Sequence, residues 1–176
     1  EGYGISLNNN FRSRVSGCVI VGNRRGIMDN AGRSNVVLCN TIVQRNDEAC
    51  IRHSGRSILV ARNNVLVAGS AGIYRPGSAD TTTESCNAFE GQSVGAVVEN
   101  ATPQALGTGS IEEDLLLDSS YRPTVNSPCV GAGVYVAGAK HFGDKAMNGG
   151  APDIGAHRYY EPRSVATDRR TRLVGA

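Results

Sequence analysis

Hydrophobic residues in the first half of the chain recur in short alternating runs. Residues 2–93 divide into four copies of one pattern, and none carries a ten-residue apolar pattern at helical spacing. Each copy is therefore expected to consist of short strands and turns. Separations of 22, 24 and 22 residues relate the isoleucines at one position of the copies, Ile5, Ile27, Ile51 and Ile73. A period in this range predicts a solenoid.

A second column is mostly polar. It contains Cys18, Asn40, Asn64 and Asn87, at separations of 22, 24 and 23 residues. Asparagine amides stacked at one corner of a solenoid can bond to each other and to the turn backbone. We expect a structural ladder without a chemical role.

The repeat length selects the fold class. Coils of 22–24 residues with three short strands each match an all-β, right-handed parallel β-helix. A left-handed hexapeptide helix would show a period of roughly 18 residues, and a leucine-rich repeat would need a recurring leucine frame. We predict β-helix coils over residues 1–109, an irregular C-terminal cap over 110–160 and a polar extended tail over 161–176. Because Glu1 already lies inside a coil, missing N-terminal coils or a neighbouring chain are expected to cover the first rung.

The composition of the chain limits the classes of partner and cofactor that it is expected to bind. With 18 basic and 16 acidic residues, the chain lacks the clustered positive charge of a nucleic-acid binder. No segment approaches the ~20 apolar residues of a membrane span. The five cysteines form no C-x-x-C pair and have no histidine spacing suited to zinc, so no cofactor is evident. We interpret Cys18, Cys39, Cys50 and Cys86 as small buried hydrophobes, and a disulfide through Cys129 stays open.

The candidate functional column varies in chemistry from coil to coil. Two residues after each isoleucine come Leu7, Asp29, His53 and Arg75, and one residue after come Ser6, Met28, Arg52 and Tyr74. If the isoleucines point inward, the second set points outward, and a bend at the strand end would expose the first. The predicted substrate-binding patch is Asp29, Arg52, His53, Tyr74 and Arg75. Such groups suit acidic sugars, although a solvated face of paired charges has the same composition.

The C-terminal half resembles a known family. Asp114-Leu115-Leu116, Tyr121-Arg122-Pro123, Ser127 to Gly133 and Pro152 to Tyr159 are similar to the segment that closes secreted bacterial right-handed β-helix proteins of the pectate-lyase-like superfamily. The resemblance implies a secreted or cell-surface protein, and calcium is implied by it alone. We expect Asp153 to cap backbone N–H groups and Ile154 to plug the core. Lys140, His141 and Asp144 are interpreted as loop surface.

Two functions remain open. The first is a module that binds polysaccharide or acts on it as an acidic-sugar lyase, with catalytic residues unknown. No carboxylate pair on adjacent rungs suggests a hydrolase. The second is a non-catalytic structural or assembly module, such as a surface protein, an adhesin or a component of a phage tail.

Overall fold

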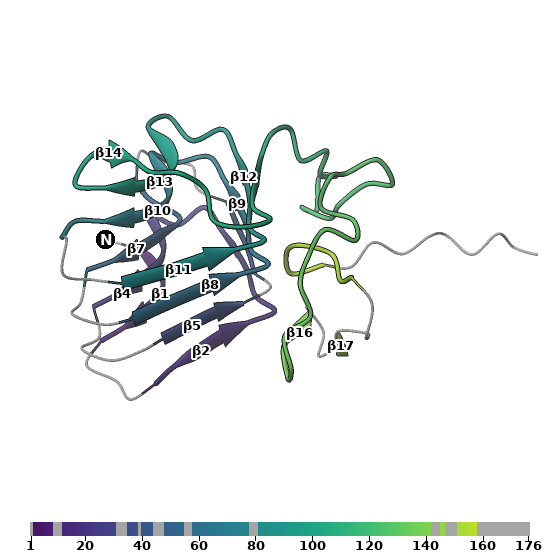
Figure 1. Ribbon diagram of the computed structural model, residues 1–176, viewed down its shortest axis with the longest axis horizontal. Helices are drawn as coiled ribbons and strands as arrows, with labels where there is room; N and C mark the ends of the chain where they lie inside the picture. Colours follow the sequence, from purple (N-terminus) through teal and green to yellow (C-terminus); the bar gives the residue numbers. More distant parts are fainter. Residues whose placement is uncertain are drawn as a thin grey trace, which may run out of the picture.

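Four coils stack on one another to form the body of the molecule, and each contributes one strand to each of three parallel sheets (Figure 1). The computed structural model describes residues 2–8, 12–30, 35–38, 40–43, 48–54, 58–77, 81–141, 145–146 and 151–157. The first sheet has the order β1 (Tyr3–Leu7), β4 (Arg25–Asp29), β7 (Ile51–His53), β10 (Ala71–Arg75), β13 (Gly95–Glu99) and β14 (Thr102–Pro103). The second has the order β2 (Arg14–Ser16), β5 (Asn35–Leu38), β8 (Ile58–Arg62) and β11 (Thr81–Ser85). The third has the order β3 (Val19–Val21), β6 (Thr41–Val43), β9 (Val65–Val67), β12 (Ala88–Glu90) and β15 (Ile111–Glu112).

The strand register confirms the repeat read from the sequence. Ile5 pairs with Ile27, Ile27 with Ile51, and Ile51 with Ile73. Every strand pair between successive coils is parallel, and the described residues contain no helix. The predicted all-β parallel solenoid is therefore confirmed.

The main core fills the inside of the solenoid with one layer of apolar side chains per coil. Ile27, Ile51 and Ile73 from the first sheet meet inward-facing residues of the other two sheets, such as Leu59 and Phe89. Gly72 accommodates the Phe89 ring, because a Cβ at this position would collide with it. The glycine and the following isoleucine thus both face the core.

The predicted asparagine ladder is present. Asn40 Nδ2 donates to Asn64 Oδ1 at 3.0 Å, and Asn64 Nδ2 donates to Asn87 Oδ1 at 2.9 Å. Each amide also donates to a backbone carbonyl of the preceding coil, and the acceptors are Val15 O, Val37 O and Ala61 O. Ser110 replaces asparagine at the next coil, where its Oγ accepts from the Asn87 backbone N–H at 3.0 Å.

The last coil is closed by a short reversal of the chain. β14 runs antiparallel to β13, with Val98 opposite Pro103. The Gln104 backbone N–H then donates to Val97 O at 2.8 Å, and Leu106 packs against the main core. Residues 102–106 therefore cover this end of the solenoid.

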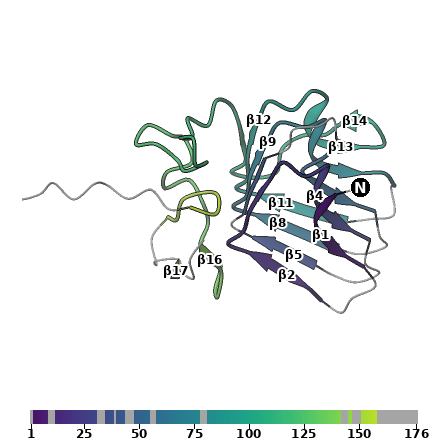
Figure 2. The ribbon, with the colours of Figure 1, turned by 180° about the vertical axis from the view of Figure 1, so that it is seen from behind.

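We call residues 110–157 the side segment, and its described part covers one side of the solenoid. We expected residues 110–160 to cap the last rung, but the described part packs along the outer face of the third sheet (Figures 1 and 2). Leu115, Cys129 and Ile154 form a second core with the outward-facing Val65 and Ala88. The physical reason is that this face is itself apolar and needs a cover.

Hydrogen bonds hold the side segment across several coils. The Gly155 backbone N–H donates to Asn63 O at 2.8 Å, and Ala156 N–H donates to Thr41 Oγ1 at 3.0 Å. Asp153 Oδ1 accepts from the Gly131 backbone N–H at 2.8 Å, as predicted. Ile154 is fully buried, also as predicted, although in the second core.

His141 corrects one expectation. It belongs to a small hairpin of β16 (Lys140–His141) and β17 (Lys145–Ala146), and 2% of it is exposed. Its Nδ1 lies 3.2 Å from Gly155 O. The interpretation of His141 as loop surface is therefore wrong, because the ring is packed against the returning chain. Asp144 lies outside the described residues.

The described cysteines are free thiols. Cys50 is buried as predicted, whereas Cys18 and Cys86 are half-buried. Cys129 is buried in the second core, and burial raises the pKa of its thiol to about 11. Cys39 and the tail over 161–176 lie outside the described residues, and so their interpretation stays a prediction. Among the described residues, no helix is long and apolar enough to cross a membrane.

Candidate functional site

The structure separates the five predicted site residues into three environments. Asp29 and His53 are fully buried, and His53 Nδ1 lies 2.8 Å from Asp29 Oδ2. The expected bend that would expose this column is absent at these two residues, whose backbones pair in register between β4 and β7. Asp29 and His53 therefore cannot form an open patch with their neighbours, and we correct that part of the prediction.

Arg52 and Tyr74 lie on the outer face of the first sheet, as predicted. They face each other on adjacent coils, with the Arg52 guanidinium carbon 5.2 Å from the centre of the Tyr74 ring. Both side chains are half-buried, and Arg52 Nε is covered and has no hydrogen-bond partner in the described part of the chain. This pair combines a cation with an aromatic surface.

Arg75 lies apart from that pair. Its Nη2 donates to Glu99 Oε2 at 2.8 Å on the next coil. The side chain lines a pocket at the end of the solenoid, together with β11 and the segment after β14. The five residues consequently do not form one continuous patch. Substrate contact by Arg52, Tyr74 or Arg75 stays a prediction.

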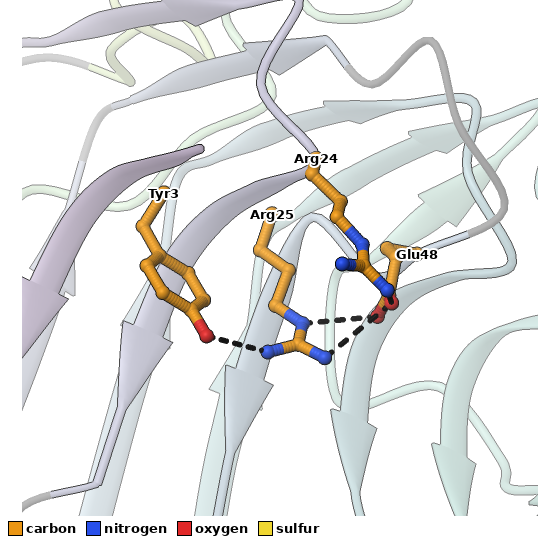
Figure 3. A network of polar contacts seen from close by, with 4 residues as sticks. All are labelled: Tyr3, Arg24, Arg25 and Glu48. Atoms are coloured by element: carbon orange, nitrogen blue, oxygen red, sulfur yellow. Dashed lines mark hydrogen bonds and ion pairs between the residues drawn. The ribbon is translucent and has the colours of Figure 1, made fainter. Parts of the chain in front are cut away.

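A polar network extends the outer face toward the first coil. Figure 3 shows Arg25 between the hydroxyl of Tyr3 and the carboxylate of Glu48, with Arg24 reaching the same carboxylate. Arg25 Nη1 donates to Tyr3 Oη at 2.9 Å, and Arg25 Nε donates to Glu48 Oε2 at 3.0 Å. Arg24 Nη2 lies 3.3 Å from Glu48 Oε1. The Arg25 guanidinium also lies over the Tyr3 ring, at 5.4 Å from its centre.

Sequence reasoning missed this network because it assumed strict alternation along each strand. Tyr3 and Arg25 precede Ile5 and Ile27 by two residues, which in a regular strand places them on the core side. Gly4, which lies between Tyr3 and Ile5, breaks the alternation. It faces the core as Ile5 does, because a Cβ at Gly4 would meet the inward-facing Ile20. The recurrence of glycine at positions 4, 26 and 72 was the available signal.

Electrostatics favour the charged forms within the network. The hydrogen bond and charge of Arg25 lower the pKa of Glu48, and Glu48 raises the pKa of Arg25. Arg24 and Arg25 both contact the Glu48 carboxylate, and the charge of Arg52 also lowers the pKa of Glu48. The face therefore carries an excess of positive charge beside two tyrosine rings.

Potential metal ligands are dispersed. No group of three or more His, Cys, Asp or Glu residues that could hold a metal ion occurs in the described part of the chain. His53 is engaged with Asp29 and fully buried, and Cys50 is a buried thiol whose pKa is raised to about 12 by desolvation. Met28 pairs with Arg52 in the column one residue after the isoleucines, whereas Cys50 packs in the core, so the two sulfur atoms belong to different faces of the sheet. These described donors do not converge on one point, as the ligands of a transition metal must.

Comparison with curated proteins and with solved structures gave no match. One protein family does match, over residues 1–106, and its description is "Periplasmic copper-binding protein (NosD)". The matched region contains the four coils and the closing reversal, but not the segment packed on the third sheet. A periplasmic family agrees with the predicted location outside the cytoplasm. The chain is a β-helix repeat protein that belongs to the NosD family.

Proposed function

We propose that this chain is an extracytoplasmic β-helix module that binds acidic polysaccharide on the outer face of its first sheet. The observation that carries the proposal is the Arg52–Tyr74 pair beside the Arg24–Arg25–Glu48 network. We call these five residues together with Tyr3 the arginine–tyrosine face.

The chemistry of this face suits a carboxylated sugar polymer. A guanidinium group binds a carboxylate through two parallel hydrogen bonds, and a tyrosine ring offers a flat apolar surface for the carbon face of a sugar. Arg25 and Arg52 come from neighbouring strands, which are ~4.8 Å apart in a β-sheet. Arg25 already binds Glu48 through two hydrogen bonds and lies three positions before the strand partner of Arg52, so Arg52 is the guanidinium group that a polymer is expected to contact first.

Copper has no part in the proposal. The family description mentions copper, but the described His, Cys, Asp and Glu side chains are separated or buried and do not converge on one point. The resemblance to the pectate-lyase-like superfamily supports contact with acidic sugar. Binding without cleavage is the form of the proposal that the arginine–tyrosine face supports, because Glu48, its carboxylate, is held by two arginines.

The test is affinity electrophoresis and calorimetry of the purified chain with polygalacturonate and alginate, with neutral dextran as the uncharged comparison. Arg52→Ala is expected to weaken binding of the acidic polymers roughly 10- to 150-fold, because the loss of a charge-assisted contact costs about 1.5–3 kcal/mol. Tyr74→Ala is expected to weaken it less.

The matched control is Arg12→Ala, which removes an exposed arginine outside the face. Equal losses from Arg12→Ala and Arg52→Ala would show that the affinity is only a general charge effect. An absence of binding to any acidic polymer, with a folded protein, would favour the structural or assembly module instead.

A further inference from the structure

A polar pocket of about 440 Å³ lies at the end of the solenoid, away from the arginine–tyrosine face. Its walls come from β10, β11 and β13, and residues 104–108 form the remaining side. The volume falls within the range of about 300–1,000 Å³ that is usual for small-molecule sites. The polar side chains that line it are Arg75, Thr82, Thr83, Glu84, Gln104 and Thr108.

The walls are fixed by hydrogen bonds. The Gly107 backbone N–H donates to the Glu84 carboxylate, and the Cys86 backbone N–H donates to Thr108 O at 3.0 Å. Gly107 has to be glycine for this approach, since a Cβ there would collide with the Glu84 backbone. The pocket is therefore formed before any ligand arrives.

Two of the residues that line the pocket each have one buried polar atom with no hydrogen-bond partner among the described residues. These atoms are Nε of Arg75 and Oγ1 of Thr82. Because both atoms lack accessible surface, a ligand in the pocket would bind instead to the exposed groups of the lining. Thr83, Gln104 and Thr108 add exposed hydroxyl and amide groups that both donate and accept.

The charges exclude an anion. Arg75 is already paired with Glu99, at 2.8 Å. The Glu84 carboxylate, on the opposite wall, accepts from Ser110 Oγ at 2.6 Å and from Asn87 Nδ2 at 2.9 Å. The lining therefore contains one carboxylate and one guanidinium group that is already paired, so it offers no unpaired positive charge to a carboxylated or phosphorylated ligand.

We propose that this pocket binds a neutral sugar ring, such as the terminal residue of an oligosaccharide. A pyranose carries several hydroxyl groups, each able to donate to a carboxylate and accept from an arginine or amide. The inference depends on the pocket alone and is independent of polymer binding on the arginine–tyrosine face.

The experiment titrates the full chain with glucose, galactose, mannose, xylose and fucose, followed by ligand-observed NMR and calorimetry. Galacturonic acid is the charged counterpart of galactose, and inorganic phosphate tests for simple anion binding. At least one neutral sugar is expected to bind saturably, and more tightly than galacturonic acid or phosphate. Arg52→Ala is expected to leave this affinity unchanged, which separates the pocket from the polymer-binding face.

Two pocket variants test the location. Thr83→Phe, at an exposed position of β11, is expected to fill the pocket and abolish sugar binding. Gln104→Ala is expected to weaken binding roughly 3- to 10-fold through the loss of a hydrogen bond. Ser119→Phe makes a comparable change at an exposed position in the side segment and should have no effect.

The inference is overturned if no neutral sugar binds saturably, or if galacturonic acid or phosphate binds more tightly. It is also overturned if binding survives in a folded Thr83→Phe protein. Should Thr83→Phe fail to fold, unchanged affinity in Gln104→Ala decides against the pocket.

Discussion

Single residues on the first sheet behave differently according to which side of the strand they occupy. Asp29 and His53 occupy the inward column above Leu7 and form a buried pair, whereas Arg52 lies one residue earlier and faces outward. Burying two polar side chains costs desolvation, and the pair is tolerated here because the two groups meet at 2.8 Å. Variants of these two residues can show how much the buried pair contributes to the free energy of unfolding.

Replacing one member of the buried pair is predicted to destabilise the fold more than replacing both. His53→Leu leaves the Asp29 carboxylate buried beside an apolar group and is expected to lower the free energy of unfolding by roughly 3–5 kcal/mol. The double variant Asp29→Leu/His53→Leu should lose less, because no charge is left in the core. Urea unfolding of the three proteins measures the difference. A double variant less stable than His53→Leu would contradict the prediction.

At the scale of elements, the asparagine ladder joins successive coils at one corner. Asn64 is its centre, since its Oδ1 accepts from both the backbone and the side chain of Asn40. Its Nδ2 donates to Val37 O and to Asn87 Oδ1. The corner is buried, so a lost bond cannot be replaced readily by water.

Asn64→Ala is therefore predicted to destabilise the protein by roughly 2–4 kcal/mol, at about 1 kcal/mol for each hydrogen bond lost. Thermal and denaturant unfolding measure the loss. Asn126→Ala is the control, because this asparagine is exposed in the side segment. If both alanine variants unfold alike, the ladder contributes no particular stability.

At the scale of the whole molecule, two cores lie on opposite sides of the third sheet. Leu66 and Phe89 face the inside of the solenoid, while Val65 and Ala88 face Leu115 and Ile154 of the side segment. Apart from β15, which pairs with β12, the described part of residues 110–157 has little regular structure of its own, and its packing depends on that outer face. We expect it to be able to open while the coils remain folded.

Ile154→Ala is predicted to loosen the side segment selectively. Removal of a fully buried isoleucine side chain costs about 2–5 kcal/mol. Limited proteolysis should then cut within residues 110–157 first and leave a resistant fragment that contains the coils. Val125→Ala, at a residue that is 62% exposed, should leave the cleavage pattern unchanged. Simultaneous loss of coils and side segment would show that the two cores unfold as one unit.

Much of the fold could be predicted because the repeat specifies it locally. The isoleucine and asparagine columns appear in the structure in the predicted register. The candidate site was predicted in part: Arg52 and Tyr74 face outward together, but Asp29 and His53 are buried. Strict alternation failed near Gly4 and Gly72, where close packing of Ile20 and Phe89 requires a residue without a side chain.

The sequence by itself determined the coil length, the stacking of like residues and the parallel solenoid, because each coil repeats the same short-range pattern. Only the tertiary structure decided what lies beside the coils. It placed the described part of residues 110–157 against the third sheet, and it formed the pocket beside Arg75. These contacts involve residues outside the repeated columns, so their geometry depends on packing between segments and not on the repeat.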